Sequence, residues 1–94
     1  MPMSSGKTYF VYILECADGT LYTGIADDVS RRVREHNGEG RVGAKYTRTR
    51  QPVVLRYQEE CEDRSAALKR EYALKQLSRS NKLELITHSS HGVY

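Results

Sequence analysis

Two short runs rich in aromatic and β-branched residues, separated by only three residues, constrain the fold of this chain most strongly. The first run extends from Thr8 to Cys16 and the second from Thr20 to Ala26. The intervening Ala17-Asp18-Gly19 has the residue types of a tight turn. The sequence therefore predicts a β-hairpin close to the N-terminus.

The length of this turn decides which faces of the hairpin Tyr12 and Tyr22 occupy. If Asp-Gly forms a two-residue turn, Ala17 pairs with Thr20 and the two tyrosines project from opposite faces. If all three residues form the loop, with its glycine in the left-handed conformation, Tyr12 pairs with Gly24 and is a diagonal neighbour of Tyr22 on one face. Gly24 then leaves a hollow beside Tyr12. Asp-Gly favours the shorter turn, so the strand pattern alone leaves both registers open.

Capping and glycine signals predict one more strand and three helices after the hairpin. Asp27 or Asp28 can cap a helix that Asn37-Gly38 ends. In chain order, the predicted elements are a helix over Val29 to His36, a loop over Gly38 to Pro52, a strand over Val53 to Glu59, a helix over Arg64 to Leu77 with Ala66, Ala67, Ala73, Leu74 and Leu77 along one side, and a short helix from Ser78 or Ser80 to about Ile86.

This order of elements is typical of an α+β domain, in which helices pack on a small antiparallel sheet. With 94 residues the chain has room for one such domain. We expect the domain to span residues 8–86, between a disordered N-terminal segment, 1–7, and a flexible C-terminal tail, 87–94. A chain of this size encloses no large cavity, so an active site is expected to be an open surface groove.

Charge is distributed unevenly along the chain. Fifteen Lys and Arg against twelve Asp and Glu give a net charge of +3, which by itself is too small to indicate a nucleic-acid partner. From Arg41 to Arg50, however, there are four cations, no acid and one aromatic residue, Tyr46. Such a segment suits phosphate contacts and base stacking. A solvated loop that is basic for solubility is the alternative.

The apolar runs and the cysteines indicate the compartment. The longest apolar run, Tyr9 to Leu14, falls far short of the ~20 residues that a membrane span requires. Cys16 and Cys61 lie far apart and form no CxxC pair, which favours free thiols in a reducing compartment over a disulfide. We therefore expect a cytoplasmic protein without membrane association.

Arg32 and His36 lie four residues apart in the first predicted helix and therefore on the same side of it. His36 lies with Val29 and Val33 on the side of the helix that is expected to face the sheet. Arg32 lies at the edge of that side. A cation and an imidazole that face a sheet carrying two phenols form a candidate phosphate pocket. Alternatively, the helix dipole favours His36 at a C-terminus and Arg32 is a solvated side chain.

Glu71 is the only acid between Arg64 and Lys82, and it projects at the margin of the apolar side of its helix. A carboxylate in that place can face a groove and bind a hard divalent cation. Glu71 and Lys75 also have the favourable i, i+4 order for a surface ion pair. Both roles stay open on spacing alone.

Taken in order, these residues resemble a GIY-YIG nuclease domain, and specifically its small stand-alone bacterial members. The resemblance runs from about Tyr9 to Ile86. The motifs that carry it are Val11-Tyr12-Ile13 and Tyr22-Thr23-Gly24 for the two triplets, Asp28 to Asn37 for the helix with an arginine and a following histidine, Gly43-Ala44-Lys45-Tyr46-Thr47 and Arg50-Gln51-Pro52-Val53 for the loop and third strand of the stand-alone branch, and Ala67-Leu68-Lys69-Arg70-Glu71 for the helix that bears a metal-binding glutamate.

Two positions depart from the family pattern. The first triplet begins with Val11 instead of glycine, which is usual for the stand-alone branch. An asparagine that many members place after the glutamate helix has Asn81 as its nearest counterpart, and Asn81 stays outside the site assignment.

The resemblance implies a three-stranded antiparallel sheet flanked by helices and a metal-dependent hydrolysis of nucleic-acid phosphodiesters, with DNA as the expected substrate. By this similarity Tyr12 is the general base for the attacking water, helped by Tyr22 or His36, and needs nearby cations to stabilise its phenolate. Arg32 stabilises charge on the scissile phosphate, and Glu71 holds one Mg²⁺ or Mn²⁺. The residues expected to contact the flanking nucleic-acid backbone are Lys45, Tyr46, Arg48 and Arg50.

Shared use of Tyr12 and Tyr22 in one site requires both on one face, which selects the three-residue turn. The competing hypothesis is a nucleic-acid-binding module that keeps this fold with little or no nuclease activity. A purely structural or protein-interaction domain is less favoured, because all five residues of the predicted site, Tyr12, Tyr22, Arg32, His36 and Glu71, are present. We expect the protein to be a monomer.

Overall fold

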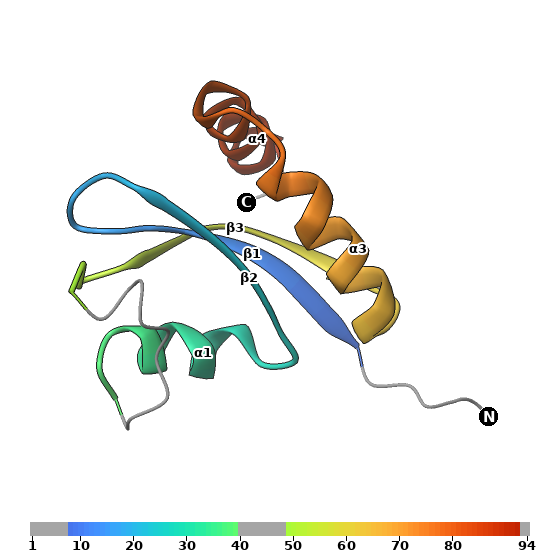
Figure 1. The fold of residues 1–94 in the computed structure, drawn as a ribbon, viewed down its shortest axis with the longest axis horizontal. Coiled ribbons are helices and arrows are strands. Elements are labelled where there is room, and N and C mark those ends of the chain that lie inside the picture. The colour runs from blue at the N-terminus through green and yellow to red at the C-terminus, as the bar shows by residue number, and fades with distance from the viewer. Residues whose placement is uncertain (1–7, 40–48, 93–94) are drawn as a thin grey trace.

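The computed structural model describes residues 8–39 and 49–92, and it has the predicted α+β architecture (Figure 1). Its elements, in chain order, are β1 (Tyr9–Glu15), β2 (Leu21–Ala26), α1 (Val29–His36), β3 (Val54–Cys61), α3 (Arg64–Lys75) and α4 (Arg79–Gly92). Two predicted segments lie wholly or largely outside the described residues. They are the N-terminal segment, 1–7, and the basic stretch from Arg41 to Arg50, of which Lys45, Tyr46 and Arg48 are not described.

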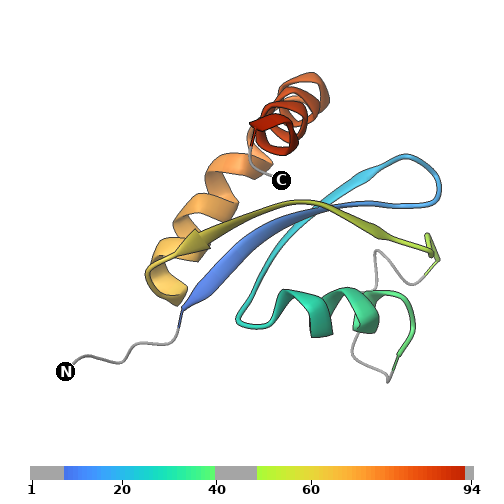
Figure 2. The same ribbon diagram turned by 180° about the vertical axis from the view of Figure 1, so that it is seen from behind.

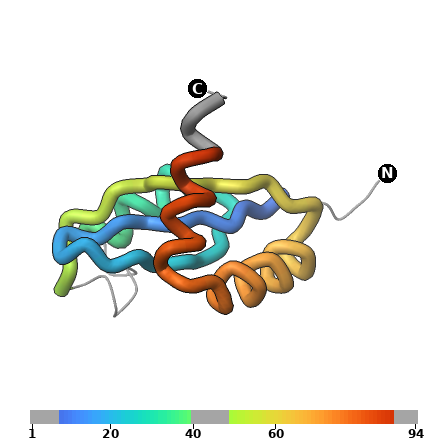
Figure 3. Tube along the Cα trace, turned by 90° about the horizontal axis from the view of Figure 1, so that it is seen from above, coloured from blue at the N-terminus to red at the C-terminus, as the bar shows by residue number. Residues whose placement is uncertain are grey.

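The three strands form one antiparallel sheet in the order β2-β1-β3, which makes β1 the central strand. Val11, Tyr12, Ile13 and Leu14 of β1 are each at most 1% exposed, so both faces of the sheet are covered. Tyr12 and Leu14 cluster with Val29 of α1. Figures 1 and 2 show α1 on this face of the sheet and α3 with α4 on the other. Seen from above, α4 crosses the strands (Figure 3).

The hairpin turn between β1 and β2 has the three-residue form. Gly19 adopts a φ of +86°, a left-handed conformation that glycine reaches without steric cost. Its N–H donates to the carbonyl of Cys16 at 2.8 Å, and the N–H of Cys16 donates to the carbonyl of Thr20 at 2.9 Å. The side chain of Asp18 adds hydrogen bonds from the N–H and hydroxyl of Thr20, at 3.1 and 2.7 Å.

This turn sets the register on which the site depends. Tyr12 pairs with Gly24, and Leu14 pairs with Tyr22. Because cross-strand partners share a face, Tyr12 and Tyr22 lie on the same face, the one that α1 covers. The register that shared use of the two tyrosines selects is confirmed.

A register shift in the pairing of β1 with β3 places Leu55 and Tyr57 on opposite faces of the sheet, although they are two residues apart. Leu14 pairs with Leu55, whereas Ile13 pairs with Tyr57, so one extra residue of β3 lies between these pairs. Leu55 therefore packs against the cluster under α1. Tyr57 and Glu59 project from the opposite face, toward α3. The strand itself begins one residue later than predicted and ends two residues later.

The first helix has the predicted bounds. The carboxylate of Asp28 accepts a hydrogen bond from the N–H of Arg31 at 3.0 Å and caps the N-terminus. Gly38, with a φ of +99°, follows the C-cap residue Asn37. The Asn37 side chain then binds both backbone groups of Val53, at 2.6 and 3.0 Å, which ties the end of α1 to the start of β3.

The second and third helices differ from the prediction in three details. The second helix, α3, ends at Lys75, two residues before the predicted Leu77. Ala67 and Leu74 of α3 are buried, as expected, but Ala73 is exposed, because at about 100° per residue it turns away from the sheet. Of the two predicted cap candidates, Ser78 caps α4 by accepting from the N–H of Asn81 at 3.1 Å. This helix does not end near Ile86 and continues to Gly92, since no glycine or proline interrupts it before that residue. The segment expected to be a flexible tail is thus helical as far as residue 92.

The two cysteines agree with the expectation of free thiols. Cys16 is buried and Cys61 is half-buried, and both are free thiols. Over the described residues, none of the helices combines the length and the apolar character that crossing a membrane demands.

Candidate active site

The phenol of Tyr12 lies at the centre of the candidate site. Its ring lies over the backbone of Gly24 in the neighbouring strand, so that a Cβ at Gly24 would meet the Tyr12 hydroxyl oxygen at 2.6 Å and Cζ at 2.8 Å. Real Cβ contacts essentially never come this close. The hollow that the sequence predicts beside Tyr12 is therefore present, and the phenol fills it.

Gly24→Ala is expected to destabilise the fold by about 1 to 3 kcal/mol, because the buried Tyr12 ring has no free space into which to move. Removing the hydroxyl relieves the shorter contact, so the double variant Gly24→Ala with Tyr12→Phe should recover part of that loss. Thermal and urea unfolding of the two single variants and the double variant measure this coupling. Strictly additive losses would mean that the ring does not lie over Gly24.

His36 completes a buried group with the two tyrosines. It is the last residue of α1 and is 0% exposed, and its Nε2 lies 3.0 Å from the Tyr12 hydroxyl oxygen. The Tyr22 ring packs edge-on against the imidazole, with 5.1 Å between ring centroids. The side-chain amide of Gln51 donates to the His36 carbonyl at 2.9 Å and holds this end of the helix. The structure thus brings Tyr12, Tyr22 and His36 together.

Burial determines the protonation states of this group. Together with the positive charge of Arg32, burial lowers the pKa of His36 to about 4, against an opposing effect of Glu35. Burial and the neighbouring Tyr22 raise the pKa of Tyr12 to about 12, although Arg32 acts in the other direction. At neutral pH a neutral imidazole therefore faces a protonated phenol. We assign the Tyr12 O–H as donor to Nε2, which places the ring proton on Nδ1.

The low pKa of His36 predicts how stability depends on pH. The unfolded chain binds this proton below about pH 6.5, whereas the folded chain resists it until about pH 4. The His36 contribution to the free energy of unfolding is therefore full above pH 6.5. It should decline by about 1.4 kcal/mol per pH unit as the pH falls to about 4, or about 3 kcal/mol in total.

Urea unfolding between pH 4 and pH 8 measures this slope, and His36→Gln is the control because it retains the acidic groups that also titrate in this range. The difference between the two proteins isolates the histidine. A difference that does not change with pH would contradict the buried, neutral state of His36.

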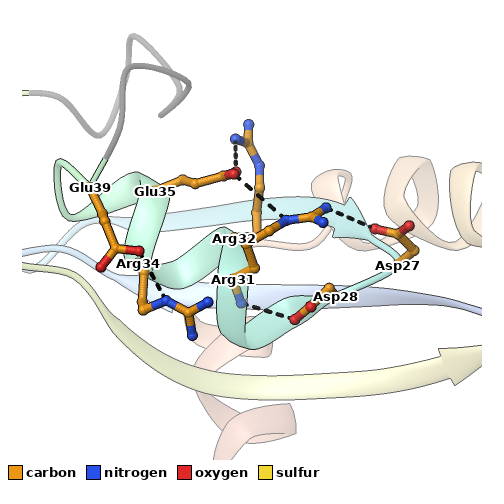
Figure 4. Close-up of polar contacts among 7 residues, drawn as sticks. All are labelled: Asp27, Asp28, Arg31, Arg32, Arg34, Glu35 and Glu39. Carbon is orange, nitrogen blue, oxygen red and sulfur yellow. Dashed lines mark hydrogen bonds and ion pairs between the residues drawn. The ribbon is translucent and has the colours of Figure 1, made fainter.

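Arg32 lies beside the phenol and is held by an acid of its own helix. Its Nη1 lies 3.0 Å from Oε1 of Glu35, and the two side chains are only 26% and 19% exposed (Figure 4). Arg32 also lowers the pKa of Tyr12 through its charge and a side-chain hydrogen bond. Arg31 reaches the other oxygen of Glu35 at 3.6 Å. Glu35 is not among the predicted site residues, although its i, i+3 spacing from Arg32 could have suggested this contact.

Glu71 forms the ion pair that its spacing allows, and its carboxylate also acts on the phenol of Tyr12. Its Oε2 lies 3.3 Å from Nζ of Lys75, which is the i, i+4 ion pair. The same carboxylate raises the pKa of Tyr12, by an effect smaller than those of burial, Tyr22 and Arg32, so it lies within electrostatic reach of the phenol. Its side chain is 19% exposed, against 51% for Lys75. The carboxylate is thus paired with Lys75 and lies within electrostatic reach of the phenol.

Of the residues predicted to bind nucleic acid, only Arg50 lies in the described part of the chain. Its Nε contacts the carboxylate of Asp18 at 3.0 Å, and its carbonyl accepts from the N–H of Ala17 at 2.9 Å. Arg50 therefore lies against the hairpin turn. Asn81 is exposed in the first turn of α4.

The family of the chain follows from comparison with known proteins. The GIY-YIG catalytic domain matches residues 8–84, which includes every element of the sheet, the site and the start of α4. The chain belongs to the GIY-YIG family. The resemblance found in the sequence is thereby confirmed, and nuclease-like chemistry is the activity that this family membership suggests.

Relatives in the same family are small bacterial proteins. A UPF0213 protein of Desulfotalea psychrophila is 54% identical over 91 residues, covering 97% of this chain and 82% of its own length. A UPF0213 protein of Staphylococcus aureus is 57% identical over 80 residues, covering 84% of this chain and 94% of its own.

Two solved structures, both from solution NMR, have similar folds. A protein from E. faecalis has a TM-score of 0.61 and 36% identity, with 98% of this chain and 96% of that chain covered. The UPF0213 protein from Bacillus halodurans has a TM-score of 0.57 and 40% identity, with 90% and 88% covered. The three-stranded antiparallel sheet and its helices are thus shared within this group.

The carboxylates near the phenol determine what kind of metal the site could take. Within residues 8–39 and 49–92 there is no group of three or more His, Cys, Asp or Glu side chains that could jointly hold an ion. Glu71 is a single carboxylate that is 19% exposed. Mg²⁺ commonly uses one or two carboxylates, keeps several waters and completes its shell with substrate phosphate. The donor set therefore fits a hydrated hard cation that binds together with its substrate, and does not fit a closed structural site.

Proposed function

We propose that this protein is a divalent-metal-dependent endonuclease that hydrolyses phosphodiester bonds, with DNA as the substrate. The observation that carries the proposal is the hydrogen bond between the Tyr12 hydroxyl and His36 Nε2, 3.0 Å long, with Arg32 and Glu71 both acting electrostatically on the same phenol. A buried phenol surrounded by a base, a cation and a carboxylate is suited to proton transfer next to a phosphate.

In the proposed reaction, the oxygen of a water molecule attacks phosphorus and the bond from phosphorus to the leaving oxygen breaks. The Tyr12 oxygen accepts a proton from this water while its own proton passes to Nε2 of His36. A neutral phenol with a pKa near 12 cannot accept a proton without this second transfer. The proton on His36 returns to solvent after the bond breaks, and the leaving oxygen takes a proton from solvent.

The substrate itself assists the transfer to His36. Free His36 is a weak base, because burial and Arg32 lower its pKa to about 4. A phosphate bound next to Arg32 adds negative charge, which favours the imidazolium and raises that pKa. Proton transfer thus becomes favourable when the phosphate is in place. Arg32 also stabilises the charge that develops on the phosphate oxygens.

Glu71 would hold the Mg²⁺ or Mn²⁺, whose bound form supplies positive charge to polarise the phosphate and to support the leaving oxygen. The ion pair with Lys75 uses Oε2 of this carboxylate, so Oε1 is the oxygen that would ligate the ion. The basic stretch, with Lys45, Tyr46, Arg48 and Arg50, binds the flanking backbone.

The alternative is a nucleic-acid-binding module with the same fold. The separating experiment incubates the purified protein with single-stranded, duplex and branched DNA and RNA, with Mg²⁺, with Mn²⁺ and with a chelator. Cleavage that the chelator abolishes supports the nuclease. Salt-dependent binding to these substrates without any cleavage supports the binding module and refutes the proposal.

A further inference from the structure

A cluster of polar side chains joins β3 to α3 on the face of the sheet away from Tyr12. Nε of Arg70 lies 2.9 Å from Oε2 and 3.1 Å from Oε1 of Glu59, so the arginine contacts both carboxylate oxygens. The Tyr57 hydroxyl donates to Oε1 of the same carboxylate. None of these three residues takes part in the proposed chemistry, yet Arg70 directly precedes Glu71.

The packing of α3 explains why this cluster bears on Glu71. The helix rests on the sheet through Ala67 and Leu74, which are 0% and 1% exposed. At about 100° per residue, Arg70 and Glu71 project about 50° to either side of this contact line. Arg70 therefore faces β3 on one side, and Glu71 faces the opposite side. A rotation that moves one of them moves the other.

Of the two buried residues of α3, Leu74 resists rotation of the helix through its full side chain, whereas Ala67, one turn before Glu71, offers little resistance. Ala67 presents a single methyl group, which lets the helix approach closely but does not interlock with neighbouring side chains. A helix with its side chains is about 10 to 12 Å across, so a rotation of about 20° would displace the Glu71 carboxylate by about 2 Å. Displacements of this size are large for a catalytic group.

We propose that Glu59 and Arg70 form a positioning pair that sets the rotation of α3 and thereby the direction of the Glu71 carboxylate. The proposal rests on the proposed function, because it concerns the residue that would hold the metal. The pair links Glu71 to the register shift in β3, since that shift turns Glu59 toward α3. Burial and Glu59 raise the pKa of Tyr57 to about 12, so its hydroxyl stays a donor to Glu59 at physiological pH.

Glu59→Gln tests the proposal against Glu15→Gln, a matched control. Glu15 forms a comparable ion pair, 2.7 Å long, with Arg56 of the same strand β3, but it does not reach α3. The phase of the periodic variation in backbone residual dipolar couplings along α3 reports the rotation of that helix. Glu59→Gln should shift this phase by about 20° and leave the fold intact, whereas Glu15→Gln should not shift it.

The second readout is the Mn²⁺ concentration that gives half-maximal cleavage. Glu59→Gln should raise it by about 10-fold, and the control should leave it unchanged. Arg70→Lys keeps the positive charge but loses the planar guanidinium, so it should give an intermediate shift. If Glu59→Gln fails to fold, the helix phase and the Mn²⁺ dependence of Arg70→Lys test the positioning pair in its place.

The outcomes separate this inference from the proposed function. An unchanged helix phase and an unchanged Mn²⁺ dependence in Glu59→Gln would overturn the positioning pair, even if the wild type cleaves. If the wild type cleaves nothing, the proposed function fails, and the helix phase alone then supports or overturns the pair. A loss of thermal stability without either shift would assign the pair a purely structural role and would likewise overturn the inference.

Discussion

Tyr12→Phe is expected to slow cleavage by about 10²- to 10⁴-fold, because it removes the hydroxyl that takes the proton of the attacking water and keeps the buried ring. Phenylalanine keeps the ring, whose Cζ lies over Gly24, so the fold should remain intact. The hydrogen bond to Nε2 of His36 is lost, which costs about 1 to 3 kcal/mol because the imidazole is buried. Single-turnover cleavage and thermal unfolding measure the two effects separately.

Tyr9→Phe is the matched control, since Tyr9 lies in the same strand and pairs with Cys61 of β3, away from His36. It should cleave at the wild-type rate. Binding of a labelled oligonucleotide should be nearly unchanged in both variants. The Tyr12 phenol is buried, and Tyr9 is not part of the proposed site. A Tyr12→Phe protein that cleaves at the wild-type rate would exclude Tyr12 as the general base.

The parts of the structure that could be predicted from sequence depend on local signals. The hairpin, the bounds of α1 and the cap at Ser78 follow from turn, capping and stop residues, which act within a few positions of the chain. The hairpin register was open on turn preference alone. Only the requirement that Tyr12 and Tyr22 share a face selected the register that the structure has.

The parts that sequence did not predict depend on contacts between distant segments. The extra residue in β3 turns Glu59 toward α3, and no local signal near Arg56 marks that shift. The two hydrogen bonds between the Asn37 side chain and the backbone of Val53 join residues 16 positions apart. The sequence suggested only the end of a helix at Asn37. The side of α3 that faces the sheet was also predicted too broadly, since Ala73 is exposed.

Glu71→Gln is expected to abolish metal-dependent cleavage while binding to nucleic acid persists. Glutamine keeps the shape of the side chain but removes the negative charge that a hard divalent cation requires. Binding should be unchanged or slightly tighter, because one carboxylate that repels phosphate is gone. Cleavage across a range of Mg²⁺ and Mn²⁺ concentrations, with binding measured in parallel, gives both results.

Two further variants separate the metal role of Glu71 from its ion pair. Lys75→Met removes the partner at 3.3 Å and leaves the carboxylate, so it should cleave normally with a stability change of only about 0.2 to 0.5 kcal/mol. Glu84→Gln removes an exposed carboxylate from α4 and controls for the change in net charge. If Glu71→Gln behaves like these two variants, its carboxylate serves only the surface ion pair. Metal-dependent cleavage would then require a ligand other than Glu71.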